Sequence, residues 1–131
     1  MKNLLFILTA LFLFSCKEEA TKQEDTSTAA QQQDGGNTLT ASEKTGEEIF
    51  NGKGNCYSCH KPQQKVIGPS IAEIAGIYAR KNGDMVSFLR GKADPIVDPS
   101  QYSVMKTNFY ITKHFTDEEM QGVVDYMMHF K

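Results

Sequence analysis

The feature that most constrains this chain is the run Cys56-Tyr57-Ser58-Cys59-His60. Two cysteines separated by two residues, with a histidine directly after the second, have the spacing that attaches a c-type haem. On a tight turn entering a helix both sulfur atoms face the same way, so each can bond covalently to one haem vinyl group while the next imidazole points at the iron. We therefore expect one covalent haem c, attached through Cys56 and Cys59, with His60 as the proximal axial ligand.

Two other kinds of site use a Cys-x-x-Cys pair, and the sequence supports both less well. A thioredoxin-like redox pair needs a βαβ surround, whereas no run of β-branched residues flanks this motif. A structural zinc site needs four ligands, but there is no second Cys-x-x-Cys pair, and His114 and His129 stand alone in the sequence. The one cysteine outside the motif, Cys16, lies at the end of the predicted N-terminal export signal.

The N-terminal residues have the pattern of an export signal. Residues 1–2 supply a positive charge, and residues 4–14 are apolar except for one threonine. This run is well short of the roughly 20 residues that span a bilayer, so a permanent transmembrane helix is the weaker interpretation. The sequence Leu-Phe-Ser-Cys at 13–16 resembles the bacterial lipoprotein cleavage box, which implies cleavage before Cys16 and attachment of lipid to it. The alternative is an ordinary secretory signal in which Cys16 is incidental.

The residues that follow Cys16 indicate a flexible tether. Up to about residue 41 the chain is mostly Thr, Gln, Ser, Ala, Asp and Glu, with Gly35-Gly36 and a single large apolar residue, Leu39. Such a composition cannot bury enough apolar surface to offset the entropy lost on ordering. A random coil of this length spans roughly 25 to 30 Å. We expect residues 1–15 to be a lipoprotein signal peptide, residues 16–41 a tether, and residues 42–131 one folded domain.

Lipid attachment predicts where the protein resides. Each buried methylene contributes about 0.8 kcal/mol, so two or three acyl chains hold a domain at a membrane. The Cys-x-x-Cys-His motif resembles those to which bacteria attach haem covalently after export. We therefore expect a lipid-anchored protein of the bacterial cell envelope, facing the periplasm or exposed at the cell surface.

The folded domain has a helical pattern. A first helix is predicted over 43–51, a second after the capping-box pair Ser70 and Glu73, a third over 84–90, and a last one after a second capping box, Thr116 with Glu119. Residues 92–115 show no clear helical pattern, and a segment of this length in a small domain is usually functional. The formal net charge is −2 and there is no tryptophan, so nucleic-acid binding gains no support.

Residues 42–131 resemble the small bacterial class I cytochromes c. The resemblance rests on the Cys-x-x-Cys-His motif, on Gly68-Pro69 after it, and on a methionine segment before the final helix. It implies an all-α fold of about four short helices wrapped round one covalent haem. Gly46 and Phe50 on the first helix and Tyr126 on the last resemble the contact residues at the helix crossing.

The resemblance also implies a role for Pro69. Its carbonyl resembles the group that accepts a hydrogen bond from the second nitrogen of the proximal histidine, which fixes the ring and increases its electron donation to iron. The alternative is that Gly68-Pro69 is only a turn.

Six methionines and two further histidines compete for the sixth iron position. Met1 is removed with the signal. Met85, Met120, Met127 and Met128 lie on helical stripes, where methionine is more often core than ligand. Met105 lies in the irregular segment between Tyr102 and Asn108, so we expect it to be the distal ligand, with Tyr102 and Asn108 lining the haem pocket. His114 is the competing candidate.

These features predict a one-electron carrier and not an enzyme. Two strong axial ligands leave no substrate position, and no acid, base or nucleophile constellation accompanies the motif. We expect a membrane-tethered carrier whose partners are redox proteins, such as a respiratory complex or a terminal oxidase, with Lys53, Lys61, Lys65 and Lys106 available to steer an acidic partner. The alternative is a haem enzyme or a gas or peroxide sensor with an open or histidine-ligated sixth position, for which His114 would be the distal acid-base group.

Overall fold

The structure is a computed structural model that describes residues 38–131. The predicted signal peptide, Cys16 and most of the predicted tether lie outside the described residues. Among the residues that are described, no helix is long and apolar enough to cross a membrane.

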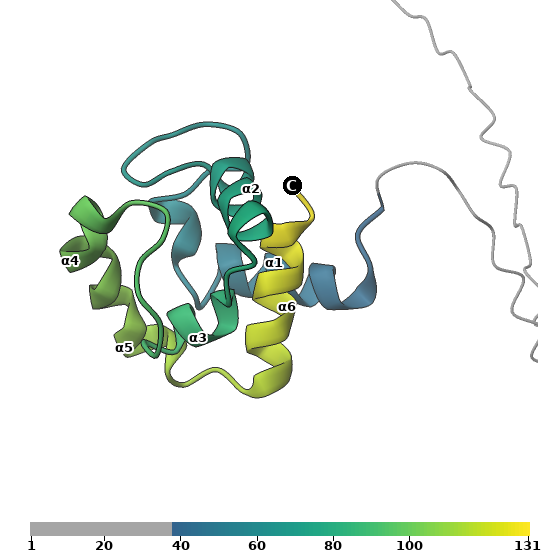
Figure 1. The fold of residues 1–131 in the computed structure, drawn as a ribbon. Coiled ribbons are helices and arrows are strands. Elements are labelled where there is room, and N and C mark those ends of the chain that lie inside the picture. The colour runs from purple at the N-terminus through teal and green to yellow at the C-terminus, as the bar shows by residue number, and fades with distance from the viewer. Residues whose placement is uncertain (1–37) are drawn as a thin grey trace, which may run out of the picture. The chain divides into compact units, whose positions relative to one another are not determined.

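The described domain is built from helices joined by turns (Figure 1). The α-helices are α1 (Ala41–Asn51), α2 (Ile71–Lys81), α3 (Met85–Leu89), α4 (Tyr102–Met105), α5 (Phe109–Thr112) and α6 (Asp117–Met128), and the 3-10 helices are η1 (Cys56–Ser58), η2 (Pro99–Gln101) and η3 (Lys106–Asn108). Residues 38–131 contain no β-strand, only an isolated antiparallel bridge between His60 and Lys65. The predicted all-α class is confirmed.

Helix α1 begins earlier than the predicted residue 43 because a capping box precedes it. The Thr40 hydroxyl accepts from the Glu43 backbone N–H at 3.2 Å, and the Glu43 carboxylate accepts from the Thr40 N–H at 2.6 Å. Glu43 is thus the third residue of the helix and not its first. The two reciprocal bonds satisfy N–H groups that the helix itself cannot.

The two predicted capping boxes form to different extents. At α6 the box of Thr116 and Glu119 is complete. At α2 the Ser70 hydroxyl accepts from the Glu73 N–H at 3.1 Å, which is the N-cap half of the box alone. Both helices start where the sequence indicates.

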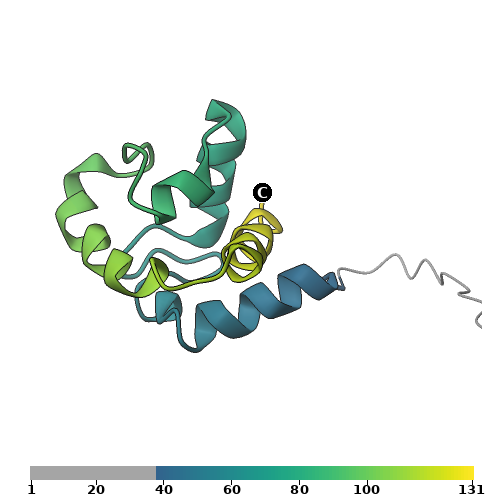
Figure 2. The ribbon, with the colours of Figure 1, turned by 90° about the horizontal axis from the view of Figure 1, so that it is seen from below.

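Helices α1 and α6 cross at two glycines. Figure 2 shows α6 nearly end-on where it passes α1. A Cβ atom on Gly46 would collide with the carbonyl of Gly122, and one on Gly122 would lie 3.0 Å from the Ser42 carbonyl oxygen. Phe50 packs edge-on against Tyr126 with ring centroids 5.5 Å apart. The predicted crossing of Gly46, Phe50 and Tyr126 is confirmed, and Gly122 is its unpredicted partner.

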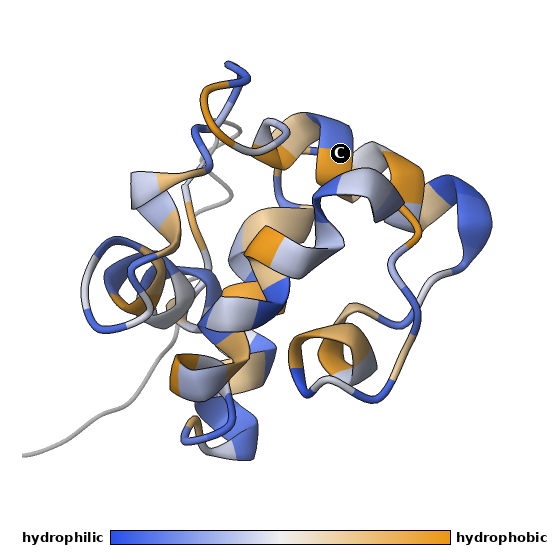
Figure 3. Cartoon of the chain, turned by 90° about the vertical axis from the view of Figure 1, so that its left-hand side faces the viewer, coloured by the Kyte–Doolittle hydropathy of each residue, from blue (hydrophilic) through white to orange (hydrophobic). Residues whose placement is uncertain are grey.

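The segment expected to be irregular, residues 92–115, contains a run of short helical turns from Pro99 to Thr112. Isolated turns of three or four residues are unstable in water, so packing must hold them. Phe88 of α3 provides this packing. The centroid of its ring lies 5.5 Å from that of Phe109 and 6.2 Å from that of Tyr102. Figure 3 shows hydrophobic and hydrophilic residues alternating along the helices, as expected for helices with one buried face.

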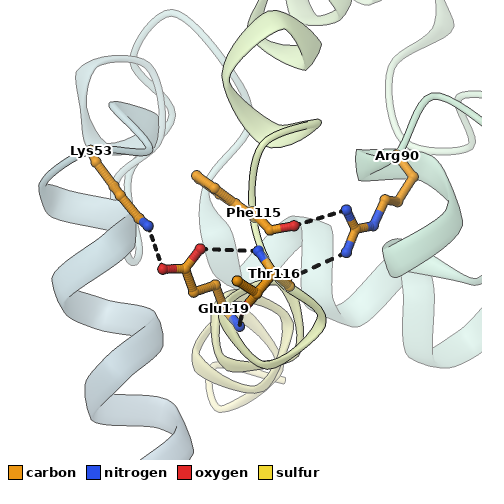
Figure 4. Close-up of polar contacts among 5 residues, drawn as sticks. All are labelled: Lys53, Arg90, Phe115, Thr116 and Glu119. Carbon is orange, nitrogen blue, oxygen red and sulfur yellow. Dashed lines mark hydrogen bonds and ion pairs between the residues drawn. The ribbon is translucent and has the colours of Figure 1, made fainter.

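A group of polar contacts joins three helix ends at the start of α6 (Figure 4). Arg90, just after α3, donates to the carbonyl oxygens of Phe115 at 3.0 Å and Thr116 at 3.4 Å. Lys53, just after α1, forms an ion pair with Glu119. These contacts fix the N-terminus of α6 between the ends of α1 and α3.

Candidate haem-binding site

The site is a cavity of about 270 Å³ on the inner side of the helices. Most of its lining is apolar, and the core faces of α2, α3 and α6 contribute Ile74, Met85, Leu89, Val123 and Met127 to it. Four potential haem or iron-binding side chains also line it: Cys56, Cys59, His60 and Met105. An apolar hollow with a few convergent donors is the arrangement that a buried cofactor requires.

The two cysteines lie on a tight turn, as predicted. Asn55 precedes them in the left-handed conformation with φ of 51°. The backbone N–H groups of Cys59 and His60 then donate to the Cys56 carbonyl oxygen at 3.1 and 3.0 Å. The turn is a 3-10 helix of three residues that does not continue into an α-helix, which differs from the predicted helix entry. Both thiols are free and face the same cavity.

The alternative sites for this motif lose support from the structure. A thioredoxin-like pair depends on a thiol with a lowered pKa, whereas burial raises the pKa of the Cys56 thiol to about 11. A zinc site needs a cluster of ligands, and residues 38–131 contain no group of three or more His, Cys, Asp or Glu side chains suited to a metal ion. The thiol pair therefore fits thioether formation better than either.

His60 is held by a carbonyl group. Its Nδ1 lies 2.8 Å from the Pro69 carbonyl oxygen. Because a carbonyl can only accept, Nδ1 carries the proton and donates, which leaves the lone pair on Nε2. Pro69 is buried, so water does not compete strongly for this bond. The contact expected between these two residues is present.

The structure places the two candidates for the sixth position differently. Met105 is the last residue of α4, is partly buried and lines the cavity. His114 is exposed and packs edge-on against Tyr110, with ring centroids 6.1 Å apart. His114 is not among the lining residues. Met85 and Met127 do line the cavity, but from the buried faces of α3 and α6.

The remaining predicted pocket residues also lie at the cavity. Pro69, Tyr102 and Asn108 all line it. The Asn108 side-chain amide donates to the Gly54 carbonyl oxygen at 3.3 Å, which links η3 to the turn before Cys56.

Sequence reasoning missed other lining residues. Tyr78 of α2 and Thr112 of α5 both line the cavity without being predicted. The Thr112 hydroxyl donates to the Leu89 carbonyl oxygen at 2.6 Å, a contact with no local sequence signal because 23 positions separate the two.

The side chains present are the ones that a covalent haem needs. Two thiols can form thioethers, an imidazole with a free Nε2 can bind iron from one side, and a thioether sulfur is available in the same cavity. The all-α fold and this donor set together place the protein in the class of small single-haem proteins.

Comparison with known proteins agrees. The family model described as cytochrome c matches residues 43–131, and the chain belongs to that family. It is a small class I cytochrome c, and its cofactor is covalently bound haem c.

Two curated proteins are similar over a shorter stretch. One is cytochrome c-552 of Nitrosomonas europaea, 45% identical over 40 residues, which covers 30% of this chain and 38% of that protein. The other is cytochrome c-551 of Azotobacter vinelandii, 42% identical over 40 residues, which covers 30% of this chain and 48% of that protein. The matched stretch thus spans less than half of either relative.

Proposed function

We propose that the protein is a one-electron carrier whose haem c is attached through Cys56 and Cys59 and ligated by His60 and Met105. When bound, the haem supplies an iron that cycles between the ferrous and ferric states. The observation that carries the proposal is that one cavity presents both a carbonyl-held imidazole and a methionine sulfur. If His60 and Met105 both bound the iron, no position would be left there for a small molecule.

The chain's own residues would set the redox properties of the site. The Pro69 carbonyl orients the His60 ring and increases electron donation from its Nε2, which favours ferric iron. Methionine is a weaker donor and favours the ferrous state. The apolar lining from α2, α3 and α6 limits the access of water. Together these groups would keep the coordination unchanged during electron transfer.

The alternative of a haem enzyme or sensor needs a distal acid-base residue. His114 is the residue that the sequence offers for this role, but it is exposed and lies outside the cavity lining. The carrier is therefore the better-supported function.

The cavity rim suggests how a redox partner would bind. Ile67 and Val104 line the cavity yet remain 63% and 53% exposed, so the rim presents apolar side chains to solvent. Lys61, Lys65 and Lys106 are close in sequence to His60 or Met105. A small interface with an apolar centre and an acidic surround would fit this rim. Lys53 is less available for this purpose because it is paired with Glu119.

The cellular setting is proposed from the sequence. The lipoprotein box at residues 13–16 supports a lipid anchor on Cys16, and the polar stretch after it supports a tether. Such a protein would shuttle electrons between redox proteins of the envelope, such as a respiratory complex or a terminal oxidase.

The test is the optical spectrum of the haem-loaded protein in its ferric form. We expect the weak far-red charge-transfer band of a sulfur-iron bond in the wild type and its loss in Met105→Ala. Met85→Leu is the matched control, because Met85 lines the same cavity from α3 and should leave the band unchanged.

Two results would contradict the proposal. Persistence of the band in Met105→Ala would assign the sulfur to another methionine. A wild-type protein that lacks the band and readily binds carbon monoxide would favour the enzyme or sensor.

A further inference from the structure

The backbone of Gly68 lies directly against the His60 imidazole. A Cβ atom built on Gly68 would collide with Cε1 of that ring and would lie 2.8 Å from Nδ1 and 3.1 Å from Nε2. Real Cβ atoms essentially never come this close to another heavy atom, so even alanine would require one of the two groups to move. The contact reaches both ring nitrogens, the one that donates to Pro69 and the one left for iron.

The loop that carries Gly68 has little freedom to withdraw. The Gly68 N–H donates to the Cys59 carbonyl oxygen at 2.9 Å, and the Gly68 carbonyl oxygen accepts from the Val66 N–H at 3.2 Å. Just beyond Pro69, the Ile71 N–H donates to the Lys61 carbonyl oxygen at 2.9 Å. The residues on both sides of Pro69 are therefore bonded back to the chain on either side of His60, at Cys59 and at Lys61.

His60 is equally constrained. Its backbone N–H donates to the Cys56 carbonyl oxygen, and the Nδ1–H of its ring donates to the Pro69 carbonyl oxygen. Thioether bonds at Cys56 and Cys59 would remove the remaining freedom of the turn. A methyl group at position 68 would then have to be accommodated by tilting or rotating the His60 ring.

We propose that Gly68 is a positioning residue for the bond between His60 and iron: the missing side chain lets the ring lie on the backbone of residue 68, and this contact sets the ring's orientation. The inference rests on the proposed function, in which His60 is an axial ligand. Gly68 is not required here for a left-handed backbone, since the glycine with a positive φ among the described residues is Gly91. The requirement is the space taken by the ring.

The test compares Gly68→Ala with Gly76→Ala in the haem-loaded protein. A Cβ atom on Gly76 meets only the Nη1 atom of Arg80 at 3.1 Å, the far end of a flexible side chain, so the same substitution there is the matched control. In Gly68→Ala we expect the hydrogen bond to Pro69 to weaken and imidazole donation to fall. The reduction potential should rise, because ferric iron loses more stabilisation than ferrous iron. Gly76→Ala should keep the wild-type potential.

A second measurement separates positioning from general destabilisation. Hydrogen exchange of the His60 Nδ1–H, followed by NMR of the ferrous protein, should be roughly two- to tenfold faster in Gly68→Ala, the range expected for loss of one hydrogen bond. Amides in the middle of α6 should keep their wild-type rates. Equal acceleration everywhere would mean that the variant is merely less stable and would overturn the proposal, as would an unchanged potential and exchange rate.

If Gly68→Ala does not form a haem-loaded protein, the inference is tested on the wild-type protein. A nuclear Overhauser effect between the Gly68 Hα protons and the His60 Hε1 proton is expected from the contact, and its absence would refute the inference. Failure of the underlying function would look different, because a wild-type protein without axial histidine ligation would contradict the carrier itself.

Discussion

Lys53, in the turn that leads into the haem-attachment motif, forms an ion pair with Glu119 in the first turn of α6 (Figure 4). The Glu119 carboxylate also accepts from the Thr116 N–H at 3.0 Å. One side chain thus caps α6 and ties it to the end of α1. Because the next residues of that turn are Gly54, Asn55 and Cys56, the pair helps to hold the site in place.

Stability should therefore depend on the charge of Glu119 in acid. The hydrogen bonds from Lys53 and from the Thr116 backbone lower the pKa of this carboxyl below its ordinary value. A lowered folded-state pKa means that its stabilising effect is present above the unfolded-state pKa and is lost as the pH falls through the folded-state pKa. Glu119→Gln should flatten the loss of stability below about pH 4.5, the ordinary value for glutamate.

The measurement is thermal unfolding of the haem-loaded protein between acid and neutral pH. Glu48→Gln is the control, because Glu48 is an exposed glutamate of α1. If both variants follow the wild-type acid profile, the ion pair and cap do not contribute to acid sensitivity. The Glu119 side chain is partly exposed, so added salt should reduce the difference.

The crossing of α1 and α6 should not tolerate a methyl group. Gly46→Ala would force a Cβ atom into the backbone carbonyl of Gly122, so the helices must separate and the contact of Phe50 with Tyr126 must loosen. We expect the free energy of unfolding to fall by about 1–3 kcal/mol, the range for overpacking a core. Unfolding in denaturant measures this change.

Gly76→Ala serves again as the control for this prediction. Its position on α2 is open except for the tip of Arg80, so the gain in helix propensity should leave stability unchanged or higher by up to about 1 kcal/mol. Equal stability of Gly46→Ala and the wild type would show that the helices cross with more room than the structure gives them.

The proposed lipid anchor on Cys16 makes a prediction about location. Cys16→Ser removes the acceptor that the lipoprotein box requires, so the haem-containing protein should move from the membrane fraction to the soluble fraction. Fractionation of cells with detection of the covalent haem measures this shift. A wild-type protein already found in the soluble fraction would favour an ordinary secretory signal.

The sequence predicted a helix start correctly where the residues that determine it lie within the same helix end. The starts of α2 and α6 followed from Ser70 and Thr116, since an N-cap acts on N–H groups within three residues. The start of α1 was placed too late because Thr40 fell inside the predicted tether. The helical turns over 99–112 were missed because aromatic packing with Phe88 and Phe109 holds them, and propensity does not.

The identity of the cofactor follows from a local motif. Cys56, Cys59 and His60 need only their mutual spacing to present two thiols and an imidazole on one turn, and that spacing is a local property of the chain. The choice between Met105 and His114 as the second iron ligand could not be made from neighbouring residues in the sequence. The tertiary structure brought Met105 to the cavity and left His114 at the surface, because a residue 45 positions from His60 reaches the site only through the packing of α3, α4 and α5.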